Sequence, residues 1–175
     1  MEQAALNPMR MIRLAKVTLN MGAGEAGPKL DKAKKIMAAI AQRKIVVTTT
    51  HKRNTFGGAK NKPIGAMVTL RGKDAHEMLT RMLKAAENRL RPSQFDKSGN
   101  FSFGVAEYID IPGVRYDPDV GIMGLDIAVT LERPGFRVRK RMIRPKPIGA
   151  RQRITKEEAI EWVRETCGVT VSDEE

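Results

Sequence analysis

Lysine and arginine side chains are the most informative chemical groups of this 175-residue chain, because they gather in two segments that contain no carboxylate. Residues 32–73 hold eleven Lys and Arg residues, and residues 133–156 hold ten, without an Asp or Glu in either. The formal net charge is +12. Like charges gathered in this way oppose compaction, so a partner that neutralises them is expected. The sequence therefore favours nucleic acid, whose phosphates do this, over the small substrate of an enzyme.

The basic segment 133–153 places Arg137, Arg139 and Arg141 at alternate positions. If this segment is extended, the three guanidinium groups project from one side of the backbone, toward the phosphates of one groove. Phe136 could stack on a base or anchor the segment, and the anchor is the favoured interpretation. The prolines of the segment prevent the basic amphipathic helix that binding to a membrane surface needs, so no membrane partner is expected.

A glycine-rich turn at 22–27 supports a rival interpretation. It matches the G-x-G-x-x-G pattern of dinucleotide-binding proteins, between a predicted strand and a predicted helix. An NADP-dependent reductase could use His51, Lys52 and Arg53 to hold the 2′-phosphate. Against it, no Asp or Glu ends the second strand, Glu25 would repel a pyrophosphate, and the later chain does not alternate strand and helix. The reductase remains the alternative function.

Other groups that could do catalysis or bind a metal are sparse. Cys167 is the only cysteine, which excludes an intramolecular disulfide and a cysteine-based zinc site, and there are only two histidines. No serine lies in a motif that would activate it as a nucleophile. No apolar run is long enough to span a bilayer, and the N-terminus lacks the features of a signal peptide. We therefore expect a non-enzymatic cytoplasmic protein without cofactor or metal.

The hydrophobic pattern predicts the elements that position these residues. It predicts strands at 14–21, 45–50, 66–71, 101–109 and 125–131. It predicts helices over 28–40, 74–90 and 155–168. Asp74 with Glu77, and Thr155 with Glu158, match capping boxes at two helix starts. In the first strand, Ala15 is expected on the core side. Residues 1–175 are thus predicted to form a single α+β domain, with a mainly antiparallel sheet and helices on one face.

Helices on one face leave the other face of the sheet to solvent or to a partner. The side chains predicted on this open face are polar or basic: Lys16, Thr18, Asn20, Thr69 and Arg71. Such groups suit contact with phosphate, ribose and base edges, although an ordinary solvated sheet face is the alternative. The basic, glycine-containing loop 51–62 is predicted to be the tip of a hairpin.

Motifs along nearly the whole chain resemble one family. They are KVTLNMGAGE from Lys16, PIG from Pro63 with VTLRG from Val68, SQFD from Ser93, GNFSFG from Gly99, YDP from Tyr116 and GIMGLDI from Gly121. In this order they resemble the universal 5S rRNA-binding protein family of the large ribosomal subunit, number five in its series. RPGFRV from Arg133 is similar to the archaeal branch of that family. The family carries the glycine turn as a strand-to-helix connection, which argues against the reductase.

The resemblance implies a non-enzymatic scaffold of the central protuberance. In that family the open sheet face holds 5S rRNA, with help from a neighbouring 5S-binding ribosomal protein, and anchors it to the large-subunit rRNA. By position, the family's RNA contacts fall on Arg10, Asn20, Gln42, Phe56 and Thr69. The family's protruding loop contacts the elbow of peptidyl-site tRNA and approaches a small-subunit head protein. Here that loop is 51–62, with the basic side chains Lys52, Arg53, Lys60 and Lys62.

Overall fold

The computed structural model describes residues 7–24, 26–53, 59–118 and 121–172. They include a five-stranded sheet in the order β2-β3-β1-β6-β5, in which neighbouring strands are antiparallel. Its strands are β1 (Arg13–Gly22), β2 (Val46–Thr49), β3 (Pro63–Leu70), β5 (Phe101–Val105) and β6 (Leu125–Glu132). The α-helices are α1 (Pro28–Ala41), α2 (Lys73–Ala85), α3 (Arg137–Lys140) and α4 (Lys156–Cys167). The α+β class and the mainly antiparallel sheet are therefore confirmed.

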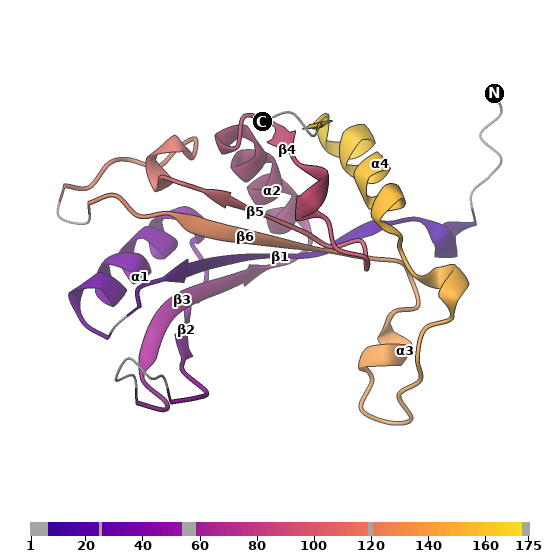
Figure 1. Cartoon of the computed structure of the whole chain (residues 1–175), viewed down its shortest axis with the longest axis horizontal. Coiled ribbons are helices and arrows are strands. Elements are labelled where there is room, and N and C mark those ends of the chain that lie inside the picture. Colours follow the sequence, from indigo (N-terminus) through magenta and orange to yellow (C-terminus); the bar gives the residue numbers. More distant parts are fainter. Residues whose placement is uncertain (1–6, 25, 54–58, 119–120, 173–175) are drawn as a thin grey trace.

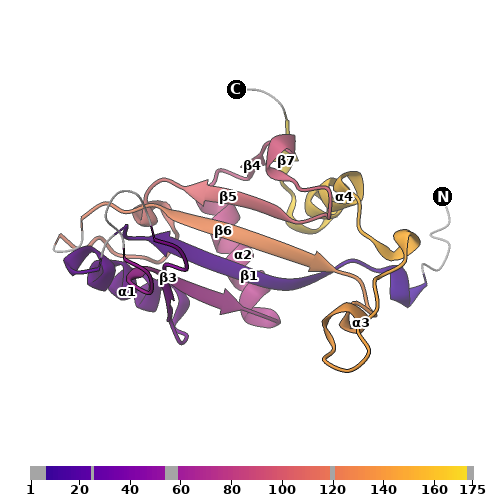
Figure 2. The same cartoon turned by 60° about the horizontal axis from the view of Figure 1, so that its bottom comes forward.

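The two sides of the sheet differ in what they carry. In Figure 1, α2 and α4 lie above the sheet, whereas the β2–β3 hairpin and the α3 segment extend below it. Figure 2 turns the lower side toward the viewer, and α2 then lies behind the strands. One face of the sheet is thus covered by helices, and the opposite face lies between two projecting segments.

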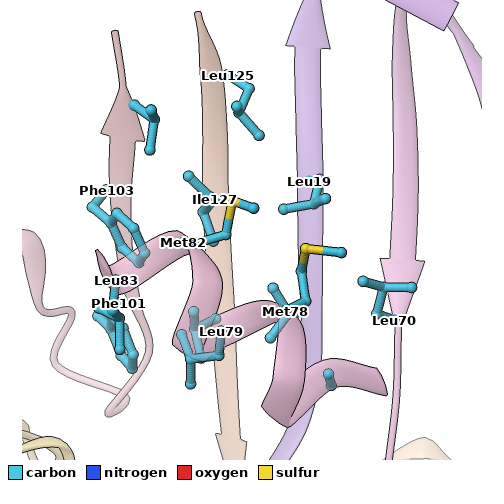
Figure 3. Close-up of a cluster of buried hydrophobic side chains, with 14 of the residues drawn as sticks. Leu19, Leu70, Met78, Leu79, Met82, Leu83, Phe101, Phe103, Leu125 and Ile127 are labelled. Atoms are coloured by element: carbon cyan, nitrogen blue, oxygen red, sulfur yellow. The ribbon is translucent and has the colours of Figure 1, made fainter. Parts of the chain in front are cut away.

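The core lies between the covered face and the helices. In β6 the buried residues alternate with outward-facing ones, as the period of two predicts for a half-buried strand. Figure 3 shows α2 crossing the strands with its apolar side toward them. The side chains that meet there include Met78, Leu79, Met82 and Leu83 of α2, with Leu19, Leu70, Phe101, Phe103 and Ile127 of the sheet. The apolar stripe of α2 therefore fixes which face of the sheet is buried.

One residue of β1 departs from the predicted alternation. Leu14 is paired with Leu131 and Lys16 with Thr130, so Ala15 is the extra residue of a β-bulge. The bulge puts Leu14 in the core, and Ala15 is only half-buried. The expectation that Ala15 faces the core was wrong, because a strict period of two cannot register an inserted residue. From Val17 onward the alternation holds.

The predicted start of α2 lies within one residue of the observed one, but its predicted capping box and its predicted end were wrong. Its N-cap is Gly72, at φ +63° and without a side-chain cap, and Asp74 forms an ion pair with Arg43 instead of capping the helix. The helix ends at Ala85, and Arg89–Leu90 form strand β4, which is parallel to β7 (Thr170–Val171). Leu90 is therefore buried by a pairing with the C-terminal part of the chain, which helical spacing could not predict.

The C-terminal helix follows its predicted signals. Thr155 Oγ1 accepts from the Glu158 N–H, and Glu158 Oε2 accepts from the Thr155 N–H, which completes the capping box. Gly168 ends α4 in the left-handed region at φ +64°.

The predicted strand at 101–109 ends at Val105, and Tyr108–Asp110 is a 3-10 turn. Among the described residues, no helix is both long and apolar enough to cross a membrane.

Candidate nucleic-acid interface

The open face is built of cross-strand rows. Thr18 of β1 lies between Thr69 of β3 and Ala128 of β6, which in turn is paired with Ser102 of β5. In the next row, Asn20 lies between Met67 and Asp126. Thr69 is exposed, and Lys16, Thr18 and Asn20 are half-buried. The side on which the sequence placed these residues is therefore confirmed, and two hydroxyl groups lie on adjacent strands in one row.

Asp126 was not considered among the residues of this face. It is exposed and paired with Asn20, so a carboxylate lies among groups that the sequence suggested were only neutral or basic. A carboxylate repels phosphate but accepts hydrogen bonds from base amino groups. This part of the face therefore suits base edges or ribose better than the phosphate backbone.

Positive charges concentrate where β1 begins. Lys140 of α3 forms an ion pair with Glu132 at the end of β6. The pKa of Lys140 is lowered by burial and by the positive charges of Arg71 and Lys16. Those two residues come from the end of β3 and from β1, so the basic segment meets the open face here. Anions bound at this place would relieve the repulsion between the three cations.

The basic segment 133–153 is closed at its base by side chains from its two ends. The Arg133 guanidinium, which is 8% exposed, donates to the carbonyl oxygens of Arg151 and Arg153 and to Glu158 Oε1, at 3.4, 3.2 and 2.8 Å. Gln152 Nε2 donates to the carbonyl oxygen of Pro134 at 3.1 Å. The segment is therefore a loop with a fixed neck beside the start of α4.

Glu158 serves both the neck and the cap of α4. Burial alone would raise the pKa of its carboxyl group. The hydrogen bond from the Thr155 N–H, the pairing with Arg133 and the more distant charge of Arg10 outweigh that, so the pKa lies below its usual value. Glu158 is therefore ionised at neutral pH and anchors the neck as a carboxylate.

The conformation expected for Arg137, Arg139 and Arg141 was wrong. Residues 137–140 form the single helical turn α3, and the Arg141 N–H donates to the Arg137 carbonyl oxygen. In a helix, side chains two positions apart do not share a face. The three guanidinium groups therefore cannot form the one-sided row that an extended segment would give.

The loop 51–62 lies between β2 and β3, which pair as the predicted hairpin. Thr50 organises its base: the hydroxyl donates to the Ala59 carbonyl oxygen at 2.8 Å, and it accepts from the Lys62 N–H at 3.2 Å. The basic side chains of the loop are exposed, and they are Lys52, Arg53, Lys60 and Lys62. Phe56 lies outside the described residues.

Two further residues taken from the family resemblance lie off the strands. Arg10 is exposed in the 3-10 turn Pro8–Arg10, whose Met9 carbonyl oxygen accepts from Gln152 Nε2 at 2.6 Å. Gln42 is the exposed C-cap of α1, in the left-handed region at φ +48°. The structure thus gathers Thr18, Asn20 and Thr69 into one patch and leaves Arg10 and Gln42 outside it.

The glycine-rich turn does not have the geometry of a dinucleotide site. The N–H groups of Ala23 and Gly24 both donate to the Ile64 carbonyl oxygen, so they are not available to a phosphate. Strand β3 lies between β1 and β2, whereas the dinucleotide fold has its first two parallel strands side by side. No cluster of three metal-ligating side chains occurs in the part of the chain that the structure describes.

A strongly basic α+β protein with a polar, uncovered sheet face belongs to the class that binds nucleic acid. Comparison with known proteins identifies the family within this class. Residues 7–55 match the model of "Ribosomal protein L5", and residues 63–162 match the model of the C-terminus of the same family.

Relatives named "Large ribosomal subunit protein uL5" align with nearly the whole chain. The protein of Methanosphaera stadtmanae is 46% identical over 95% of this chain and 99% of its own length. That of Sulfurisphaera tokodaii is 47% identical over 97% of both chains. That of Nanoarchaeum equitans is 45% identical over 94% of this chain and 98% of its own. The chain therefore belongs to the ribosomal protein L5 family, in its archaeal type, and is a structural, non-enzymatic constituent of the ribosome. The reductase interpretation was wrong.

Proposed function

We propose that this protein binds 5S rRNA with the open face of its sheet and helps to attach it to the large-subunit rRNA. It would do so in the central protuberance of the large subunit of the cytoplasmic ribosome. The observation that carries the proposal is the row of hydroxyl groups on Thr18 and Thr69, next to the amide of Asn20. These groups sit on the paired strands β1 and β3 inside the sheet, so they are held in place before the RNA binds.

The two parts of the interface would play different roles. Lys16 and Arg71 would contact phosphates, where the release of counterions supplies much of the affinity. Hydrogen bonds to ribose and base edges would come from Thr18, Thr69 and Asn20. These bonds would fix the register of the RNA on the protein. The hydrogen-bonding groups therefore decide specificity, and the charges decide affinity.

The remaining contacts of the proposal come from the family resemblance. Arg10, Gln42 and Phe56 would add rRNA contacts around the open face. The loop 51–62 would contact peptidyl-site tRNA with its four basic side chains, on the side that approaches a small-subunit head protein. A neighbouring 5S-binding ribosomal protein would share the 5S rRNA. The exposure of the described basic side chains in this loop supports such a contact.

Replacing the hydrogen-bonding groups of the open face tests the proposal. Asn20→Ala and Thr69→Ala should each weaken binding to 5S rRNA by about 1–3 kcal/mol, because each leaves a polar RNA group without its partner. The affinity is measured by filter binding at fixed salt, since the salt concentration alone changes it strongly. An unchanged circular dichroism spectrum verifies the fold.

Thr166→Ala is the matched control, because Thr166 is an exposed threonine on α4, away from the open face. It should leave the affinity for 5S rRNA unchanged. Wild-type affinity in both Asn20→Ala and Thr69→Ala would rule out the open face as the 5S rRNA site.

A further inference from the structure

A groove lies between the open face and the basic segment 133–153. Its volume is about 1040 Å³, the upper end of the range for pockets that hold small ligands. It is lined by strands β1 and β6, the turn 97–100, residues 136, 139, 140 and 145–148 on the two arms of the loop around α3, and residues 153–154. The two arms are joined by a hydrogen bond from the Lys146 N–H to the Val138 carbonyl oxygen at 3.2 Å. The groove is thus a place where separate parts of the chain converge.

The described side chains of the groove carry a large excess of positive charge. Its cations are Lys16, Lys97, Arg139, Lys140, Lys146 and Arg153, and its one carboxylate is Glu132. Glu132 pairs with Lys140, and the other five form no ion pair within the described residues. Arg137 and Arg141 do not line it. The groove therefore has the charge of an anion-binding site with several contact points.

The walls of the groove are apolar as well as cationic. Phe136 and Ile148 are half-buried there, and Pro145 and Pro147 extend the same wall. Asn100, together with Ser98 in the turn, adds polar groups that can both donate and accept hydrogen bonds. A ligand that matches this lining has negative charges, a flat apolar surface and hydrogen-bonding edges. A nucleotide has all three.

The lining is also expected to distinguish unpaired RNA from paired RNA. A duplex offers its phosphates and ribose groups but keeps the faces of its bases stacked, so the apolar wall would have no partner. In a single strand, a base can leave the stack and lie against an aromatic or apolar side chain. The combination of cations with an apolar wall therefore favours an unpaired segment.

We propose that this groove holds an unpaired segment of RNA, with its phosphates on the lysine and arginine side chains and one unstacked base against Phe136 and the proline-containing wall. The inference rests on the proposed function, because the RNA would be part of the rRNA that the protein binds. It adds Lys97, Lys146 and Arg153 to the interface and assigns Phe136 a contact with a base.

The test compares single-stranded oligouridylate with an RNA duplex of equal length, both bound by the full chain over a salt series. The wild-type protein should prefer the single strand by about tenfold or more. Lys97→Ala/Lys146→Ala should lower the single-strand affinity. It should also reduce the slope of log affinity against log salt by about 1.4, because each lost phosphate contact contributes about 0.7. The control Lys29→Ala/Lys35→Ala removes the same charge from exposed positions of α1 and should leave this slope unchanged.

Phe136→Leu tests the base contact separately from charge. It should weaken single-strand binding about tenfold while leaving the salt slope and the duplex affinity unchanged. Equal affinity for duplex and single strand, or equal losses in the α1 control, would overturn the groove proposal. If 5S rRNA binding persists in that case, the proposed function stands without the groove. Failure of the wild-type protein to bind any of these RNAs would overturn both the groove proposal and the proposed function.

Discussion

Arg133 lies in the most basic part of the chain, yet its side chain faces inward. Its guanidinium donates hydrogen bonds to two carbonyl oxygens at the far end of the segment that it begins and to the carboxylate of Glu158 on α4. Its Nε has no hydrogen-bond partner among the described residues, which costs about 1–3 kcal/mol. The three other bonds offset that cost and hold the neck of the loop closed. In the sequence, Arg133 belongs to the same basic run as the exposed residues that follow it, because the sequence alone does not distinguish a buried arginine from an exposed one.

Replacing this arginine should therefore affect stability. Arg133→Met keeps most of the side-chain volume but removes three hydrogen bonds and the partner of Glu158. The free energy of unfolding should fall by about 2 kcal/mol, measured by urea denaturation. Arg151→Met is the matched control, because Arg151 is an exposed arginine of the same loop, and its effect should stay within about 0.5 kcal/mol. Equal stability of the two variants would contradict a structural role for Arg133.

At the scale of elements, the turn before β5 is held against the start of α4. Gly99 lies in this turn at φ +75°, and an added Cβ would lie 2.4 Å from Ile154 Cγ2. Only a residue without a Cβ fits this approach and this backbone conformation without strain. Because Ile154 is 2% exposed, it has little room to move away. The turn that carries Lys97 and Asn100 is therefore fixed relative to α4.

Gly99→Ala should destabilise the protein through both effects. A left-handed conformation costs an L-residue about 1–2 kcal/mol, and overpacking costs about 1–3 kcal/mol. We expect the free energy of unfolding to fall by about 3 kcal/mol, which is measured as a lower midpoint of thermal unfolding. Gly104→Ala is the control, since its added Cβ would meet its nearest atom at 3.7 Å, an ordinary contact, and φ is not positive there. A wild-type midpoint in Gly99→Ala would mean that the turn is not held as described.

The elements that sequence predicted well are those with one buried face. The alternation in β6 and the stripe of α2 record burial directly, because the side chains of a buried face must be apolar. The failures have non-local causes. Leu90 is buried by the pairing of β4 with β7, which lie far apart along the chain. The turn α3 has only four residues, too few to form a helix without tertiary support.

The candidate interface divides in the same way. The facing of Thr18, Asn20 and Thr69 follows from alternation, so the sequence could predict it. The groove could not be predicted, because Lys97 and Lys146 line it together only through the packing of separate segments. The runs of basic residues did indicate that phosphates were the partner. They could not distinguish Arg139, which lines the groove, from Arg137 and Arg141.

For the whole molecule, the positions of the two basic segments matter more than the net charge. Loop 51–62 connects to β3 near the end of the sheet where Gly22 pairs with Gly65. Segment 133–153 leaves β6 at the other end, where Arg13 pairs with Glu132. Figures 1 and 2 show the β2–β3 hairpin and the α3 segment at opposite ends of the sheet. The ten residues of β1 span the distance, about 30 Å. This is several times the screening length of about 8 Å at physiological salt.

Charge reversal in the loop should therefore act locally at physiological salt. The variant Lys52→Glu/Arg53→Glu/Lys60→Glu should lose about tenfold or more in affinity for tRNA, because it replaces phosphate attraction by repulsion. Its affinity for 5S rRNA should stay within about twofold of wild type, because salt screens the new charges from the open face. Both affinities are measured by filter binding. The control Lys29→Glu/Lys35→Glu/Lys84→Glu makes the same change on the outer surfaces of α1 and α2 and should spare tRNA binding.

At low salt, the same variant tests whether the distance between the two basic segments is what separates their effects. At about 0.01 M salt the screening length grows to about 30 Å, which equals the separation of the two segments. The reversed charges in the loop should then weaken 5S rRNA binding as well, although the open face itself is unchanged. A loss of 5S rRNA affinity at physiological salt as large as the loss for tRNA would show that the two RNAs share one surface. A loss confined to low salt would place them on two surfaces coupled only through the field of the molecule.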